Sequence, residues 1–180
     1  MTTHSQSARS GGGFRKKAFT PRTFLHGVVR SLRNGPALLR ARRAGRVSEP
    51  LVEKIMLATT AVNDCQYCAR FHTDRASEVG VEAEVINAIL EQDIGETVDT
   101  DERAALLFAQ RYAETDEDPG EKAIEVLEAE YGPEMAADIR AYVRAIYFGN
   151  LLGNSYDALR YWLRIQIDDF VRDLRYRCTE

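Results

Sequence analysis

The sequence predicts an all-α protein, and three observations support that prediction. Apolar residues recur at the three- and four-residue spacing of helices along most of the 180 residues. No stretch alternates apolar and polar residues in the way that a strand requires, and short segments rich in Gly, Pro, Asn or Asp separate the helical stretches. We therefore expect several antiparallel helices joined by short loops.

The beginning of the chain is expected to be a basic arm. Residues 1–20, which contain the sequence SARSGGG, have the composition of a disordered tail. Residues 23–32 predict a helix, and the stretch from Pro36 to the residue before Gly45 predicts a second, short one. We divide the chain into a disordered basic tail at 1–20, a basic helical arm at 21–46 and an all-helical domain at 47–180.

The domain is expected to contain a series of helices. Ser48 predicts the cap of a helix that ends at Asn63-Asp64, and the next helix begins at the cysteines and ends near Gly80. Further helices are predicted at 82–92, 101–114, 121–131, 134–148 and 155–174. Gly149 and Gly153 are expected to interrupt or bend the chain between the last two.

Composition places the chain among ordinary globular proteins. Apolar residues make up 44% of the sequence and charged residues 29%, and no stretch approaches the roughly 20 apolar residues that cross a membrane. Three cysteines are too few for a disulfide-stapled secreted scaffold, and the sequence opens without the pattern of a secretory signal. We predict one domain, a cytoplasmic location and no membrane partner.

The net charge of −4 hides an uneven distribution. Residues 1–50 hold eleven Lys or Arg and one acid, whereas residues 51–180 hold 13 basic and 27 acidic residues. The preferred interpretation of the arm is a solvated tail. The arm can also attract the acidic body, a neighbouring subunit or another anionic surface. It contains no known nucleic-acid-reading motif, so we do not expect a nucleic-acid partner.

The segment NDCQYCARFH, residues 63–72, carries the strongest chemical signal. On one helix Cys65, Cys68 and His72 share a face, and both thiols fall in the first turn, where unpaired N–H groups and the helix dipole favour a thiolate. If the preceding helix forms a hairpin with this one, Glu53 lies within a turn of His72 and can orient or protonate its imidazole. The four residues predict a candidate catalytic site.

Each of these residues also has a plainer interpretation. The cysteines can be two small buried side chains or half of a zinc site, His72 a histidine with a structural hydrogen bond, and Glu53 a solvated residue. A structural zinc site needs four ligands, and the chain has few candidate residues to provide them. A catalytic zinc with three protein ligands is still an alternative. We predict no metal ligand.

The spacing E-x11-C-x2-C-x3-H, from Glu53 through Cys65 and Cys68 to His72, resembles the core signature of the AhpD-like alkylhydroperoxidases in the carboxymuconolactone decarboxylase superfamily. The similarity runs from about Glu49 to Leu90. A weaker similarity at 142–160, with the sequence YFGNLLGNSYDAL, looks like the asparagine-bearing late helix of peroxidase-related members. The first 45 residues carry no resemblance.

The resemblance implies a thiol-dependent peroxidase or disulfide oxidoreductase with an AhpD-like helical fold. It implies that Cys68 attacks a hydroperoxide, that Cys65 then closes a Cys65–Cys68 disulfide, and that Glu53 and His72 relay protons. It implies no cofactor beyond this redox-active disulfide, a dithiol or lipoyl-type reductant, and a homo-oligomer, either trimer or hexamer. Tyr67 stands where the best-studied branch has a second histidine, which predicts a shorter relay or a different substrate.

Two other functions remain as alternatives. A carboxymuconolactone decarboxylase-like enzyme would use His72 and Glu53 as acid and base, although members with that activity generally lack the cysteine pair. A redox-responsive binding protein would use the basic arm for its partner and the dithiol as a sensor. Cys178 is expected to be a bystander thiol, with an intersubunit or regulatory disulfide as the alternative. Asn150, Asn154 and Asp157 can line a pocket at a glycine-bent helix or satisfy backbone groups at the bend, and the structural role is preferred.

Overall fold

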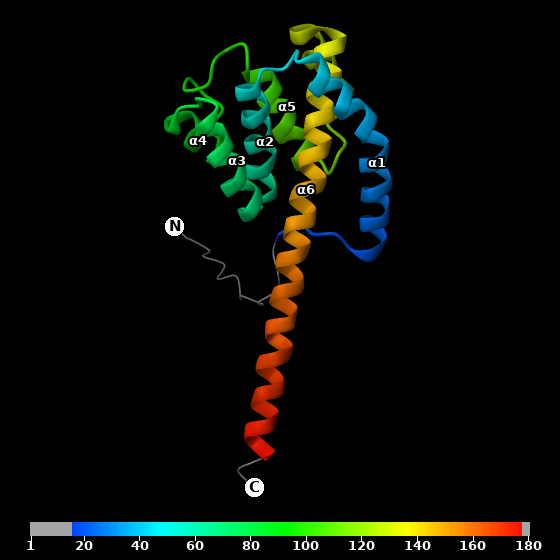
Figure 1. The fold of residues 1–180 in the computed structure, drawn as a ribbon, viewed down its shortest axis with the longest axis vertical. Helices are drawn as coiled ribbons and strands as arrows, with labels where there is room; N and C mark the ends of the chain where they lie inside the picture. Colours follow the sequence, from blue (N-terminus) through cyan, green and yellow to red (C-terminus); the bar gives the residue numbers. More distant parts are fainter. Residues whose placement is uncertain (1–15, 178–180) are drawn as a thin grey trace, which may run out of the picture.

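The described residues of the computed structural model form a bundle of helices without a strand (Figure 1). The structure describes the backbone of residues 16–177 and the side chains of residues 16–168. The helices are α1 Pro21–Ala44, α2 Glu49–Asn63, α3 Gln66–Glu78, α4 Ala83–Leu90, α5 Arg103–Glu114 and α6 Glu121–Arg177. The all-α prediction is confirmed for this part of the chain.

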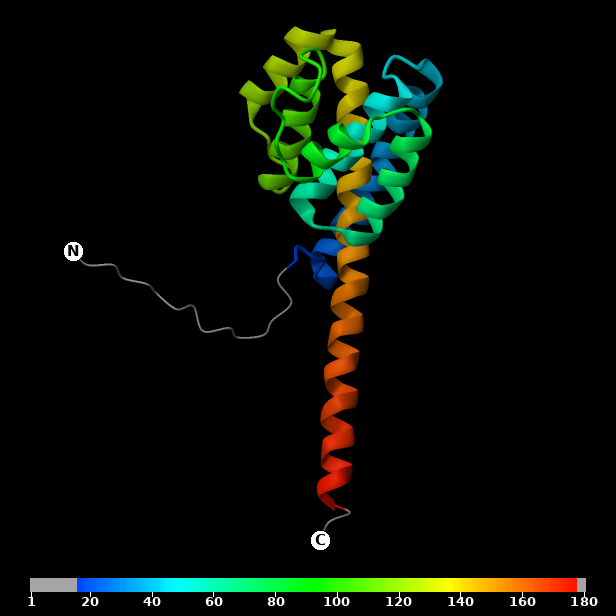
Figure 2. The same cartoon turned by 90° about the vertical axis from the view of Figure 1, so that its left-hand side faces the viewer.

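Helix α2 lies at the centre of the bundle. It packs against α3, α4, α5 and α6, while α1 lies along the outer side of α6 (Figures 1 and 2). Apolar side chains of α2, α5 and α6 are fully buried between these helices and form the core: Ile55, Leu57, Leu106, Leu127, Ile139 and Val143. The second half of α6 projects beyond the other helices in both views.

The ends of the helices follow local capping rules. The Thr20 hydroxyl accepts from the Thr23 N–H and begins α1, and Gly45 ends that helix in the left-handed region, with φ 61°. The Ser48 hydroxyl accepts from the Leu51 N–H and begins α2. Gly132, with φ 73°, breaks the helical geometry within α6 at the point predicted from Gly132-Pro133.

Two predicted helix boundaries are absent. Helix α1 runs through Pro36 as one helix, because its packing against α6 offsets the lost backbone bond. The buried Asn34 amide, two residues before the proline, donates to the Ala141 carbonyl at 2.9 Å. Helix α6 continues through Gly149 and Gly153, where an interruption or a bend was expected, so the helix is not interrupted there.

Residues 16–20 differ from the disordered tail predicted for 1–20. They form a short non-helical segment, called here the strap, which crosses from α1 to the other helices. The Phe19 N–H donates to the Ser155 hydroxyl at 2.8 Å, and the Lys17 carbonyl accepts from the Asn154 amide at 2.9 Å. The rest of the predicted tail, residues 1–15, and Cys178 lie outside the described residues.

Among the described helices, none combines the length and the apolar character that crossing a membrane requires.

Candidate active site

The two cysteines lie where α2 gives way to α3. Asp64 ends α2 in the left-handed region, with φ 51°, so the chain reverses at once and Cys65 becomes the N-cap of α3. The Cys65 sulfur accepts a hydrogen bond from the Cys68 backbone N–H at 3.4 Å. The dithiol therefore occupies the positive end of the helix, as the sequence predicts.

Helix α6 forms the wall behind the dithiol. A Cβ atom added to Gly153 would lie 2.7 Å from the Cys65 sulfur and 3.8 Å from the Cys68 sulfur, so both sulfurs lie against the same stretch of backbone. Cys65 is only 1% exposed, whereas Cys68 is partly exposed, and both are free thiols. A molecule arriving from solvent meets Cys68 first.

The two thiols have opposite pKa shifts. The pKa of Cys65 is lowered to about 6, chiefly because its sulfur accepts the hydrogen bond of the Cys68 thiol. Burial opposes this change, and backbone N–H groups and the Lys16 charge lower the pKa further. The pKa of Cys68 is raised, first because its S–H is the donor in that bond and then by burial. The two thiols thus share a hydrogen bond, and the shifts favour a thiolate within the pair.

Glu53 and His72 join α2 to α3 beside the cysteines. The Glu53 Oε2 and His72 Nδ1 atoms lie 2.7 Å apart, and the two side chains are only 13% and 12% exposed. The carboxylate fixes the orientation of the ring and, when Nδ1 carries its proton, leaves Nε2 to accept another. Cys68 and His72 are four residues apart on α3 and share a face. The predicted hairpin contact is present.

A buried group of asparagines lies behind the dithiol. Asn63 donates to the Asn150 carbonyl oxygen at 3.2 Å, and Asn150 donates to the Thr60 hydroxyl at 3.0 Å. The Asn150 side chain also bonds to the Cys68 thiol and opposes the rise in its pKa. Asn150 and Asn154 are fully buried. Asn150 therefore contacts the site directly, in addition to the structural role preferred for it.

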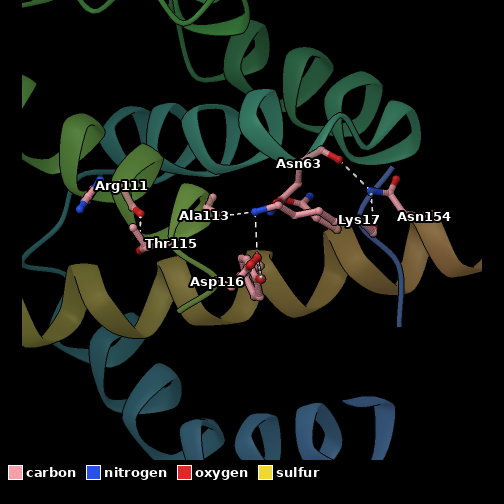
Figure 3. A network of polar contacts seen from close by, with 9 residues as sticks. Lys17, Asn63, Arg111, Ala113, Thr115, Asp116 and Asn154 are labelled. Atoms are coloured by element: carbon pink, nitrogen blue, oxygen red, sulfur yellow. Dashed lines mark hydrogen bonds and ion pairs between the residues drawn. The ribbon is translucent and has the colours of Figure 1, made fainter. Parts of the chain in front are cut away.

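The strap is tied to the same region. Asn154 donates both to the Asn63 carbonyl at 2.7 Å and to the Lys17 carbonyl, while the Lys17 amine donates to the Ala113 carbonyl at 2.7 Å (Figure 3). The Lys16 amine lies 3.4 Å from the Asp64 carboxylate, one residue before Cys65. The strap thereby places a positive charge beside the dithiol.

Aromatic side chains form the outer rim of the site. Tyr67 and Tyr156 make an edge contact with ring centroids 6.0 Å apart. The Arg160 guanidinium donates to the Tyr67 hydroxyl at 3.3 Å and lies over the Tyr156 ring. Tyr67 is thus held by an arginine from the projecting part of α6, and the phenol faces a cation rather than a proton-carrying group.

All four predicted residues, Glu53, Cys65, Cys68 and His72, lie at the junction of α2 and α3. Sequence reasoning missed the contribution of Gly153 and Lys16 and preferred a structural role for Asn150, although an asparagine inside the apolar stripe of α6 is a signal for a buried polar contact. In the part of the chain that the structure describes, no three His, Cys, Asp or Glu side chains are grouped so as to hold a metal ion.

The fold and the site define an all-helical protein with a dithiol at a helix start and a carboxylate–histidine pair next to it. Residues 35–111 match the model of the carboxymuconolactone decarboxylase family. The match spans α2, α3 and α4 and contains all four predicted site residues, which confirms the resemblance to the superfamily that includes the AhpD-like proteins. Comparisons with curated proteins and with solved structures give no significant match.

Proposed function

We propose that the protein is a thiol-dependent peroxidase or disulfide oxidoreductase that works through Cys68 and Cys65. The observation that carries the proposal is that two free thiols, Cys65 buried and Cys68 partly exposed, lie together against Gly153 at the start of α3, where the pKa of Cys65 is lowered. Such a pair holds a thiolate at neutral pH and has a second thiol within reach of any oxidised sulfur.

The proposed reaction begins when the Cys68 proton passes along the hydrogen bond to the Cys65 thiolate. The Cys68 thiolate then attacks the terminal oxygen of a hydroperoxide, ROOH, and the O–O bond breaks. Cys68 becomes a sulfenic acid, and the alkoxide leaves as ROH with a proton from His72, which Glu53 orients.

In the second step Cys65 reacts with the sulfenic acid of Cys68, and the two sulfurs form a disulfide. The Cys65 thiol passes its proton to the His72–Glu53 pair, and the Cys65 sulfur attacks the Cys68 sulfur. The S–O bond breaks, and hydroxide leaves as water with that proton. In total one hydroperoxide, the Cys68 thiol, the Cys65 thiolate and the proton from His72 give one alcohol, one water and one disulfide, and a dithiol of the lipoyl type would reduce the disulfide again.

Mass spectrometry after one equivalent of peroxide tests this proposal. Reduced protein should lose two hydrogens, and peptide mapping should place the new disulfide between Cys65 and Cys68. The Cys65→Ser and Cys68→Ser variants are the controls, since neither can close that bond. Two free thiols in the wild-type protein after exposure to peroxide would contradict the proposal.

A decarboxylase-like reaction is the second candidate function. The description of the matched family and the 2.7 Å contact between Glu53 and His72 favour it, because a carboxylate–histidine pair can serve as acid and base without sulfur. Turnover of γ-carboxymuconolactone that is unchanged in Cys68→Ser and lost in His72→Gln would support this candidate and overturn the first.

We further propose a homo-oligomer. Its support is the resemblance together with the exposed apolar side chains on the projecting part of α6: Tyr156, Leu159, Trp162, Leu163 and Ile167. Light scattering of the purified protein gives the number of chains directly. A trimer or a hexamer is expected, and a monomer at micromolar concentration would contradict it.

A further inference from the structure

A cavity separate from the dithiol lies between α1, α6 and the loop that follows α5. Its volume is about 1000 Å³, and Glu53, Cys65, Cys68 and His72 do not line it. Small-molecule sites in proteins commonly have volumes of roughly 300–1000 Å³. Most of its wall lies outside residues 35–111, because α1 and the later part of α6 contribute much of it.

One part of the wall is aromatic. Phe108 and Tyr112 of α5 meet Tyr147 of α6, with ring centroids 6.3 Å apart within α5 and 5.6 Å apart between Tyr112 and Tyr147. The Tyr112 hydroxyl donates to Glu117 and the Tyr147 hydroxyl to Asp116, so the polar ends of both rings are already bonded. Phe108, Tyr112 and Tyr147 are only 4%, 6% and 5% exposed, so a small apolar part of each ring borders the cavity.

The cavity also carries an excess of positive charge. Five Lys or Arg and three acids line it, and Lys17 and Arg30 pair with the acids Asp116 and Glu117. Within the described residues, Arg33 has no acidic partner, and Arg144 bonds to the uncharged Tyr112 hydroxyl. Arg33 and Arg144 therefore carry positive charges that no carboxylate of the cavity neutralises, and these charges can bind an anion.

Two buried polar atoms at the same end lack partners. Asn34 is 7% exposed, and although its amide nitrogen donates to the Ala141 carbonyl, its Oδ1 atom has no donor. Arg140, the neighbour of Ala141, pairs with Glu128 at 3.4 Å through one terminal nitrogen, but its Nε–H has no acceptor. Buried groups of this kind are normally bonded, so the site lacks one donor and one acceptor.

We propose that this cavity binds a small amphipathic organic anion. The apolar body lies against the rings of Phe108, Tyr112 and Tyr147, and the anionic group lies between Arg33, Arg140 and Arg144. A hydroxyl or N–H group beside the anion donates to Asn34. The proposal is independent of the peroxidase chemistry, because the two sites share none of these residues.

Two dyes that differ in one group test the proposal on the full-length protein. 1-Anilinonaphthalene-8-sulfonate has an apolar body, an N–H and an anion, and N-phenyl-1-naphthylamine has the same body and N–H without the anion. Fluorescence titration should give one saturable site per chain, with the anionic dye bound about tenfold more tightly. Equal affinity for both dyes, or no saturation, would overturn the proposal.

Variants locate the bound dye. Ala37→Trp, which fills the cavity, should abolish binding of the anionic dye. Arg33→Gln should weaken binding of the anionic dye about fivefold and leave binding of the neutral dye unchanged. Arg33→Lys should restore the affinity for the anionic dye. Arg164→Gln on the projecting part of α6 is the matched charge control. Loss of binding in Leu159→Gln with retention in Ala37→Trp would place the dye on the exposed helix and overturn the proposal.

Discussion

Gly153 of α6 and Cys65 at the start of α3 are in direct contact, and the contact exists only because Gly153 has no side chain. A Cβ atom at this position would lie 2.7 Å from the Cys65 sulfur, closer than such atoms approach each other in proteins. The wall of the dithiol site is thus a glycine in a helix that also forms the core. The position of the sulfur depends on that residue.

The Gly153→Ala variant should therefore slow peroxide reduction by about 10- to 100-fold, because the Cys65 sulfur must move from its present place. Gly149→Ala is the matched control, since an added Cβ there has no neighbour within 4 Å. The control should keep full activity and gain up to about 1 kcal/mol of stability from the higher helix propensity of alanine. Equal rates for both variants would show that the contact does not matter.

Single-cysteine variants should separate the roles of the two sulfurs. Cys65→Ser is expected to accumulate a sulfenic acid on Cys68 after one equivalent of peroxide, because no neighbouring thiol resolves it. Dimedone labelling and mass spectrometry detect this adduct. Cys68→Ser should give no adduct, since Cys65 is almost fully buried. An adduct on Cys65 in that variant would reverse the assigned order.

Glu53→Gln should lower the rate of peroxide reduction by about 100-fold with little effect on folding, since it removes the carboxylate that orients the His72 ring. Glu49→Gln, at the start of the same helix and outside the site, is the control. A wild-type rate in Glu53→Gln would contradict the role assigned to this carboxylate.

Lys16→Met should raise the pKa of Cys65. The hydrogen bond from Cys68 is the main cause of the low pKa, and the Lys16 charge is one of the smaller ones. The thiolate of the wild-type protein should be lost as the pH falls through about 6, and at that pH the variant should contain about half as much of it. Ultraviolet absorbance of the thiolate measures this, with the Cys65→Ser/Cys68→Ser protein as background.

Lys16→Arg is the matched control, because it keeps the charge and should titrate as the wild type does. If Lys16→Met and wild-type protein share one titration curve, the strap does not influence the dithiol.

Local patterns predicted much of this architecture. Gly45 located the end of α1 and Ser48 the start of α2, and the hairpin at Asn63-Asp64 correctly placed Glu53 next to His72. The sequence also located the dithiol at a helix start. Those features need no knowledge of distant packing.

The remaining features depend on contacts between distant residues. Gly153 was expected to interrupt a helix, but the core around α6 keeps that helix continuous and uses the glycine for close approach to sulfur. The strap looked like part of a disordered tail, because its partners Ser155 and Asn154 lie 136 and 137 residues later in the chain. Composition alone cannot reveal such pairs.

The same separation affects synthesis on the ribosome. Residues 17–19 emerge first, yet Asn154 and Ser155, which bind Lys17 and Phe19, are translated 137 and 136 residues after those partners. Contacts that span so much of a chain form slowly, and the nascent α1 has no completed α6 to pack against. The pocket around the two sulfurs therefore closes only after residues 153–155 have left the ribosome, and until then the nascent cysteines are open to oxidants and chaperones alike.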